Sequence, residues 1–326
     1  MRIFGRFLGR TIIFGAVLAA AMWVWGPYEQ ISLKPAFVPA TIGADIDGYL
    51  SAQEARFDDI TPGVEKRVLW RDAPGARADL AVVYIHGFSA TSEEIRPVPD
   101  RVAEALGANL VFTRLQGHGR DGAALDTATV QGWADDLAEA MEIARRIGDD
   151  VVIVATSTGA SLVAAMLDQP DVMAGLKGLV MISPNFAINN PMAPLLTLPA
   201  ARLWVPVIGG RTRSWTPQND AHGRYWTTSY PTTAVFQMAA LVEQARNTDY
   251  ADVQVPTLVW FSDADSVVSA AATREVMARW GRAPVLAAQE PRDGMDPGAH
   301  VIAGDILSPG ETDRVIGGIM KFINGL

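Results

Sequence analysis

One serine lies where the sequence passes from a buried strand directly into a helix. The segment VVIVATSTGASLVAAML reads as an apolar strand, a tight turn centred on Ser157 and a helix. A serine on such a turn has its hydroxyl raised above the sheet, and the N–H of Thr158, at the helix N-terminus, can stabilise an oxyanion. The pattern indicates a nucleophile for acyl transfer. The competing interpretation is a serine that only caps the helix.

A general base must accompany such a serine, and the chain has only four histidines: His86, His118, His222 and His300. His86 and His118 precede the serine, and His222 lies within a proline-rich insertion. Only His300 follows the last predicted strand, in a loop from which an imidazole can reach the serine. We therefore expect His300 to be the base, against the alternative of an ordinary structural or surface histidine.

The acid that would orient this histidine is expected just after the predicted strand 257–261. Two aspartates, Asp263 and Asp265, follow it in the polar turn SDADS. A carboxylate there would hold the imidazole tautomer and stabilise the imidazolium that forms as the serine loses its proton. The aspartate that does not bind the histidine would be a solvated turn residue or a helix cap.

Apolar runs of strand length alternate with helical patterns from about residue 64 onward. Strands are predicted at 80–85, 110–113, 151–155, 179–182, 257–261 and 285–288. Helices are predicted at 93–106, 130–147, 159–167, 270–280 and 311–323. The strands are near-continuous apolar runs, as parallel strands buried on both faces are. This alternation predicts the α/β class, with a mostly parallel sheet flanked by helices.

Residues 184–250 break the alternation with proline-rich, tryptophan-bearing sequence before an amphipathic helix around 233–246. An insertion of this length between two strands predicts a cap over the active site. The cap contains the apolar residues Leu195, Leu196, Leu203, Trp204 and Val205. These residues favour an apolar substrate, with Trp204 as a candidate contact. The alternative is that they only form the hydrophobic core of the cap itself.

The motifs together resemble the α/β-hydrolase superfamily, in the branch of bacterial carboxylesterases and monoacylglycerol lipases also described as serine-aminopeptidase-like. The resemblance covers about residues 65–326. Its segments, in order, are His86-Gly87-Phe88, the turn Gln116-Gly117-His118-Gly119, the helix with Trp133 and Asp136, the turn at Ser157, and the loops with Asp265 and His300. Two positions depart from the family pattern: Ala155 replaces the first glycine of G-x-S-x-G, and Ser262 replaces a glycine often found before the acid.

The resemblance implies an α/β-hydrolase fold with a cap insertion, and hydrolysis of carboxylic esters through an acyl-enzyme without a cofactor or metal. It implies Ser157, Asp265 and His300 as catalytic residues, with Asp265 favoured because a polar turn before a Val-Val pair is typical of the acid loop. The N–H groups of Phe88 and Thr158 would hold the oxyanion, and Phe88 would also contact a small-molecule ester, lipid-derived or otherwise apolar. The alternatives are an amidase or peptidase with the same triad, and a catalytically silent binding protein.

The N-terminal segment has the asymmetry of an export signal. Three arginines, Arg2, Arg6 and Arg10, precede an uncharged apolar run at 11–26. We interpret it as an uncleaved membrane anchor with Trp23 and Trp25 at the far interface. A signal peptide cleaved near Ala19-Ala20-Ala21 and a buried core helix are the alternatives.

This interpretation divides the chain into an anchor or signal segment at 1–26, a stalk and irregular lead-in at 27–64, and the hydrolase domain at 65–326 with its cap at about 184–250. With the arginines inside, the domain lies outside the cytoplasm. It is then anchored to the inner membrane or, if the segment is cleaved, periplasmic or secreted.

The charge and the cysteine content of the chain exclude several kinds of partner and site. The formal net charge is -9, and the three N-terminal arginines leave 24 basic against 36 acidic groups in the rest of the chain. Such a surface repels nucleic acid. There is no cysteine, which excludes disulfides, a thiol nucleophile and thiolate metal sites.

Overall fold

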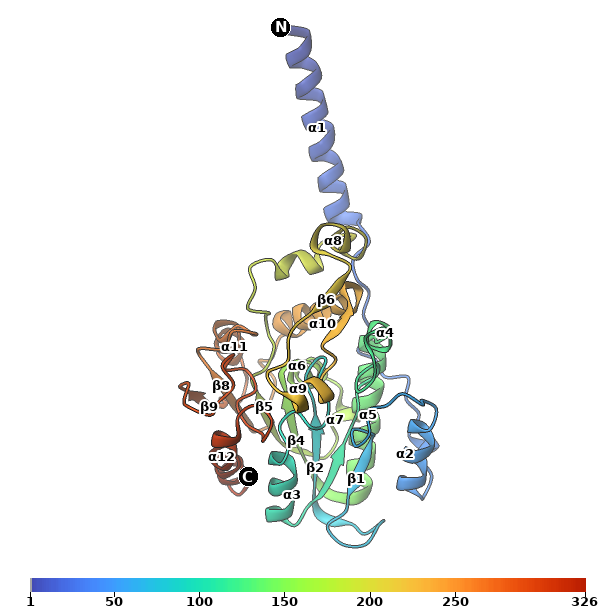
Figure 1. Ribbon diagram of the computed structural model, residues 1–326, viewed down its shortest axis with the longest axis vertical. Coiled ribbons are helices and arrows are strands. Elements are labelled where there is room, and N and C mark those ends of the chain that lie inside the picture. Colours follow the sequence, from blue (N-terminus) through green and yellow to red (C-terminus); the bar gives the residue numbers. More distant parts are fainter. Residues whose placement is uncertain (1) are drawn as a thin grey trace.

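The computed structural model describes residues 2–326, with side chains described for 9–18 and 20–326. Within this part, a central seven-stranded sheet is covered by helices on both faces (Figure 1). In spatial order the strands are β1 (Arg67–Leu69), β3 (Asn109–Phe112), β2 (Ala78–Ile85), β4 (Gly148–Thr156), β5 (Leu176–Ile182), β8 (Thr257–Ser262) and β9 (Val285–Gln289). Only β1 is antiparallel to its neighbour. The predicted mostly parallel sheet flanked by helices is confirmed.

The structure contains helices that flank this sheet, helices of the cap and the projecting helix α1. They are α1 (Arg2–Trp25), α2 (Ile46–Glu54), α3 (Val98–Leu106), α4 (Gly122–Asp126), α5 (Val130–Ile147), α6 (Ser157–Ala165), α7 (Pro170–Met173), α8 (Ala201–Gly209), α9 (Asp220–Tyr225), α10 (Val235–Asn247), α11 (Ala270–Met277) and α12 (Thr312–Ile323). Helices α3 and α12 pack together over one face of the sheet, and α5, α6 and α10 lie over the other.

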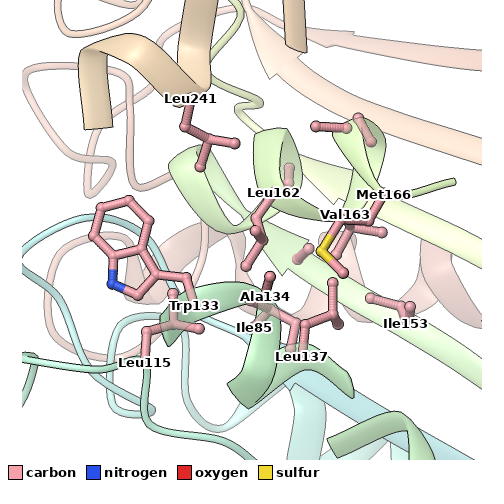
Figure 2. Packing of buried hydrophobic residues seen from close by; sticks show 14 of the residues in the cluster. Ile85, Leu115, Trp133, Ala134, Leu137, Ile153, Leu162, Val163, Met166 and Leu241 are labelled. Atoms are coloured by element: carbon pink, nitrogen blue, oxygen red, sulfur yellow. The ribbon is translucent and has the colours of Figure 1, made fainter. Parts of the chain in front are cut away.

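The larger core lies between the sheet and helices α5 and α6. Figure 2 shows Trp133 and Leu137 of α5 together with Leu162 and Val163 of α6 and Ile153 of β4. All are almost completely buried, and full burial of one such side chain contributes about 1.5 to 3 kcal/mol. This packing holds the carboxyl end of β4, where Ser157 begins α6.

Two elements differ from the sequence-based expectation. Helix α3 begins at Val98 rather than at residue 93, because Pro97 precedes its first turn and proline is suited to a helix start but not to its interior. The lead-in 27–64, expected to be irregular, contains α2, which Asp45 caps by accepting the N–H of Gly48 at 2.9 Å. Apolar side chains of the lead-in join the core, and its Glu54 forms a buried ion pair with Arg114.

The chain between β5 and β8 forms the cap. It contains α8, α9 and α10, together with a hairpin of β6 (Thr212–Ser214) and β7 (Ser229–Pro231). Helix α1 runs away from the domain, and its end lies beside α8 (Figure 1). There the N–H of Ala200 donates to Pro27 O at 2.8 Å, and Arg202 pairs with Glu29 at 2.5 Å.

Among the residues whose side chains the structure describes, no helix is long and apolar enough to cross a membrane. The predicted anchor falls in part on residues 1–8 and 19, whose side chains lie outside that part.

Candidate active site

Ser157 lies at the carboxyl end of β4, on the turn that leads into α6. Its φ is 51°, in the left-handed region that a non-glycine residue adopts only where its surroundings hold it there. The turn packs closely on the end of the neighbouring strand β2, since a Cβ on Gly159 would lie 2.4 Å from the carbonyl oxygen of His86. Ala155, which replaces the first glycine of G-x-S-x-G, is fully buried in the core.

A continuous chain of hydrogen bonds joins three side chains at this turn. His300 Nε2 lies 3.1 Å from Ser157 Oγ, and His300 Nδ1 lies 2.8 Å from Asp265 Oδ2. The N–H groups of Val267 and Val268 donate to Asp265 Oδ1 at 2.8 and 2.9 Å. The carboxylate is therefore fixed with its second oxygen toward the imidazole.

The two aspartates of the acid loop point in different directions. Asp263 forms an ion pair with Arg274 at 2.6 Å, and both side chains are about half exposed. Asp265 is 4% exposed and faces His300. The structure thus brings Asp265, and not Asp263, to the histidine.

The loop that carries His300 is held by its own hydrogen bonds. Asp296 Oδ2 accepts the N–H groups of His300 and Val301, both at 3.1 Å. The Ser183 hydroxyl, just after β5, donates to the carbonyl oxygen of His300 at 2.7 Å. These contacts tie the loop to the same edge of the sheet as Ser157.

The electrostatic surroundings favour a proton on His300. Burial by itself lowers the pKa of His300, because it penalises the charged ring. The nearby carboxylate of Asp265, with further contributions from Glu94 and Asp296, outweighs burial and raises the pKa of His300 above its ordinary value. The imidazolium is therefore stabilised where a proton from Ser157 would arrive.

The loop after β2 lies against the turn at Ser157. Phe88 and Thr158 both line the cavity at Ser157, and neither backbone N–H has a backbone acceptor in the described part of the chain. His86 lies behind the loop, where its Nδ1 bonds Gly87 O at 2.8 Å and its Nε2 accepts the N–H of Leu115 at 3.1 Å. Burial lowers the pKa of His86 to about 4, so its ring is neutral and orders the loop.

A cavity of about 390 Å³ lies over Ser157. Phe88 is among its lining residues, as expected for a substrate contact, and its ring packs edge-on against Tyr230 of the cap. The sequence-based reasoning missed the remaining cap residues of the lining, including Trp215, His222 and Met238. The only signal for them was their position in the insertion, and His222 was considered only as a possible base.

The sequence pattern of one family matches most of this domain. Residues 76–286, more than half of the chain, match the family described as serine aminopeptidase, S33. The chain belongs to this family. The prediction of an α/β-hydrolase in the serine-aminopeptidase-like branch is confirmed.

Some proteins with a similar sequence or structure are named as lipolytic enzymes. A thermostable monoacylglycerol lipase from Bacillus sp. (strain H-257) is 24% identical over 192 residues, which are 58% of this chain and 72% of that protein. A structure from work on the metagenome-derived lipolytic enzymes LipS and LipT has a TM-score of 0.66 at 19% identity, over 82% of this chain and 100% of the other. A soluble variant of the Saccharomyces cerevisiae monoglyceride lipase has a TM-score of 0.61 at 9% identity, over 80% and 91%. These structural likenesses show a shared fold.

In this α/β-hydrolase the motif residues on α5 hold the turn after β3. Trp133 Nε1 donates to Gln116 O at 3.0 Å, and Asp136 Oδ2 accepts the N–H of Gln116 at 2.6 Å. The Lys66 ammonium group, in turn, lies 2.6 Å from Asp136 Oδ1. These residues therefore support the site from behind and do not line its cavity.

A second cavity of about 430 Å³ adjoins the first within the cap of this α/β-hydrolase. The two cavities share Ile188, Tyr230 and Met238 as lining residues. Trp204, expected to contact the substrate, lines this second cavity and not the one over Ser157. Ile208 also lines it and is 70% exposed, so the second cavity reaches the surface at α8.

Proposed function

We propose that the chain is a serine carboxylic ester hydrolase in which Ser157 is the nucleophile, His300 the base and Asp265 the acid that orients it. The observation that carries this proposal is the continuous hydrogen-bond chain from Asp265 through His300 to Ser157. Its geometry is that of the triad used for acyl transfer on many folds.

The arrangement supports a two-step reaction. Ser157 Oγ attacks the acyl carbonyl carbon while His300 Nε2 takes its proton and returns it to the leaving alcohol; water then hydrolyses the acyl-enzyme by the same route. The N–H groups of Phe88 and Thr158 hold the negative oxygen of each tetrahedral intermediate. One such donor typically contributes about 3 to 4 kcal/mol.

The two adjoining cavities support an apolar acyl group. Leu195, Leu196, Trp204 and Val205 line the second cavity, which therefore suits a hydrocarbon chain, while the ester carbonyl lies at Ser157 in the first. The Bacillus protein of similar sequence is named as a monoacylglycerol lipase. We propose lipid-derived esters, such as monoacylglycerols or lysophospholipids, as the substrates.

Helix α1 would bring this enzyme to a membrane, with the catalytic domain outside the cytoplasm. The arginines before its uncharged run and the exposed Trp23 and Trp25 near its end support this placement. Leu203, Val207 and Ile208 on the neighbouring α8 are also largely exposed. An apolar surface on α8 would contact the membrane and place the opening of the second cavity against the lipid.

A fluorophosphonate probe tests the proposal directly. Folded wild-type protein is expected to be labelled, with the adduct on the peptide that contains Ser157. It is also expected to hydrolyse a p-nitrophenyl ester faster than the p-nitroanilide of the same acyl group. Faster anilide cleavage would favour an amidase, and no labelling of folded protein would favour a binding protein.

The pH dependence of kcat/KM follows from the electrostatics of His300. The base must be neutral, and the pKa of His300 is raised, so kcat/KM is expected to rise with pH along a limb whose midpoint lies above about 6.5. Asp265→Asn removes the main raising interaction and leaves burial, so the midpoint is expected to move to lower pH. A wild-type midpoint below the ordinary histidine value would contradict the assignment.

The second cavity predicts a change in chain-length preference. Val205→Phe on α8 is expected to fill part of it and to lower kcat/KM for p-nitrophenyl dodecanoate by about four-fold for each CH₂ excluded, from about 0.8 kcal/mol per CH₂. Hydrolysis of the butyrate ester is expected to change little. Val207→Phe on the exposed face of the same helix is the matched control, and equal effects of the two variants would contradict the assignment of this cavity.

A further inference from the structure

Glu94 is a buried carboxyl group beside the triad, and its only part so far is a contribution to the raised pKa of His300. It is 2% exposed and lines the cavity over Ser157. Its Oε2 accepts the backbone N–H of Gly87 at 2.7 Å and the Tyr84 hydroxyl at 3.0 Å. Burial raises the pKa of Glu94, and the N–H of Gly87 opposes that rise by stabilising the carboxylate.

Gly87 lies close to both Glu94 and Ser157. A Cβ on Gly87 would lie 2.8 Å from Glu94 Oε1 and 3.0 Å from Ser157 Cβ, so a larger residue would displace the Glu94 carboxylate or Ser157. Glycine, however, has the least restricted backbone of all residues. The loop that lies against Ser157 therefore needs hydrogen bonds at Gly87 to keep one conformation.

Gly87 is hydrogen-bonded at both its N–H and its carbonyl oxygen. The N–H donates to Glu94, and the carbonyl oxygen accepts from His86 Nδ1 at 2.8 Å and from the N–H of Ala90 at 3.3 Å. In a trans peptide the C=O and the following N–H point in opposite directions. With Gly87 O turned toward His86, the N–H of Phe88 points away from His86.

We propose that Glu94 is a positioning residue, whose hydrogen bond to Gly87 holds the N–H of Phe88 toward the oxyanion that forms on the substrate. This role rests on the proposed ester hydrolysis at Ser157. Glu94 takes no part in making or breaking bonds in it; it acts through the conformation of residues 87 and 88.

Substitutions at Glu94 separate this role from simple packing. Glu94→Ala removes the acceptor and is expected to lower kcat about 100-fold, the scale of losing one oxyanion donor, with KM within about three-fold because the oxyanion exists only in the transition state. Glu94→Gln retains an amide oxygen for the same N–H and is expected to recover most of kcat. If the alanine variant is unstable, Glu94→Leu fills the same space without an acceptor.

A trifluoromethyl ketone supplies a second readout. Ser157 Oγ adds to its carbonyl carbon, the serine proton moves to His300, and the ketone oxygen becomes a stable oxyanion. The inhibition constant is expected to rise in parallel with the fall in kcat across the Glu94 variants. Tyr84→Phe is the matched control, because it removes the other buried donor to the same carboxylate and leaves the bond to Gly87.

The possible results are distinct. Glu94→Ala with wild-type kcat and wild-type inhibitor affinity would overturn the inference alone, as would equal losses in Tyr84→Phe or a glutamine variant no better than alanine. A folded wild-type protein without esterase activity would overturn the proposed function and this inference with it.

Discussion

Ser157→Ala is expected to lower kcat for p-nitrophenyl butyrate by at least about 10⁵-fold, since loss of the serine nucleophile in an enzyme with this triad costs about 10⁶. The variant is also expected to lose fluorophosphonate labelling. Alanine leaves the packing of the turn intact, so the unfolding temperature is expected to stay near that of the wild type.

Ser161→Ala is the control for this result. Ser161 lies one turn further along α6, is fully buried and donates to Asn185 O at 2.5 Å. Loss of this hydroxyl is expected to change kcat by no more than about ten-fold, because its role is structural. More than a hundredth of wild-type activity in Ser157→Ala would mean that another group is the nucleophile.

Asp265→Asn is expected to lower kcat about 10⁴-fold, through the tautomer of His300. The N–H groups of Val267 and Val268 donate to one side-chain oxygen of residue 265. An asparagine must therefore turn its own oxygen to them and its NH₂ toward His300 Nδ1. The ring would then carry its proton on Nε2, where it cannot accept the proton of Ser157.

Asp263→Asn provides a matched control two residues away. Asp263 is exposed and bonded to Arg274, so its neutral variant is expected to keep kcat within about two-fold. Steady-state rates with one soluble ester compare the two variants. Equal losses would show that the acid loop acts through its overall charge and not through the hydrogen bond to His300.

The core of the fold was predictable because its signals are local. Each strand from β2 to β9 in the main sheet is an apolar run that can be read within a few residues, and α5 has the predicted bounds 130–147. The short antiparallel β1 has no such run, and its place depends on pairing with β3. Helix α2 was missed because the proline-rich sequence before it obscured the capping signal at Asp45.

The three side chains of the hydrogen-bond chain, proposed above as the triad, could be selected from the sequence for a different reason. Ser157 lies in a strand, turn and helix that are contiguous in sequence, and His300 could be chosen by elimination among four histidines. The sequence alone left Asp263 and Asp265 open, because a side chain's direction within a turn depends on tertiary hydrogen bonds. Only the structure distinguishes the pair.

Residues positioned by the cap or by irregular loops were not predictable. Trp215 and His222 reach the cavity through the conformation of the cap, which has no periodic pattern. Glu94 was assigned to a helix that, because of Pro97, begins four residues after it. Its contact with Gly87 lies within the irregular loop between β2 and α3, whose geometry no local signal describes.

The contact between the lead-in and α8 has a consequence for the order of synthesis. Glu29 bonds Arg202, 173 positions later in the chain, and also accepts from Gln237 Nε2 on α10 at 2.6 Å. The ribosome therefore releases Glu29 long before Arg202 and Gln237. The cap cannot complete its packing until α10 has been made. A chain shortened past Glu29 would leave Arg202 and Gln237 without their common partner, so a truncated form that keeps the shape of the cap must retain this residue.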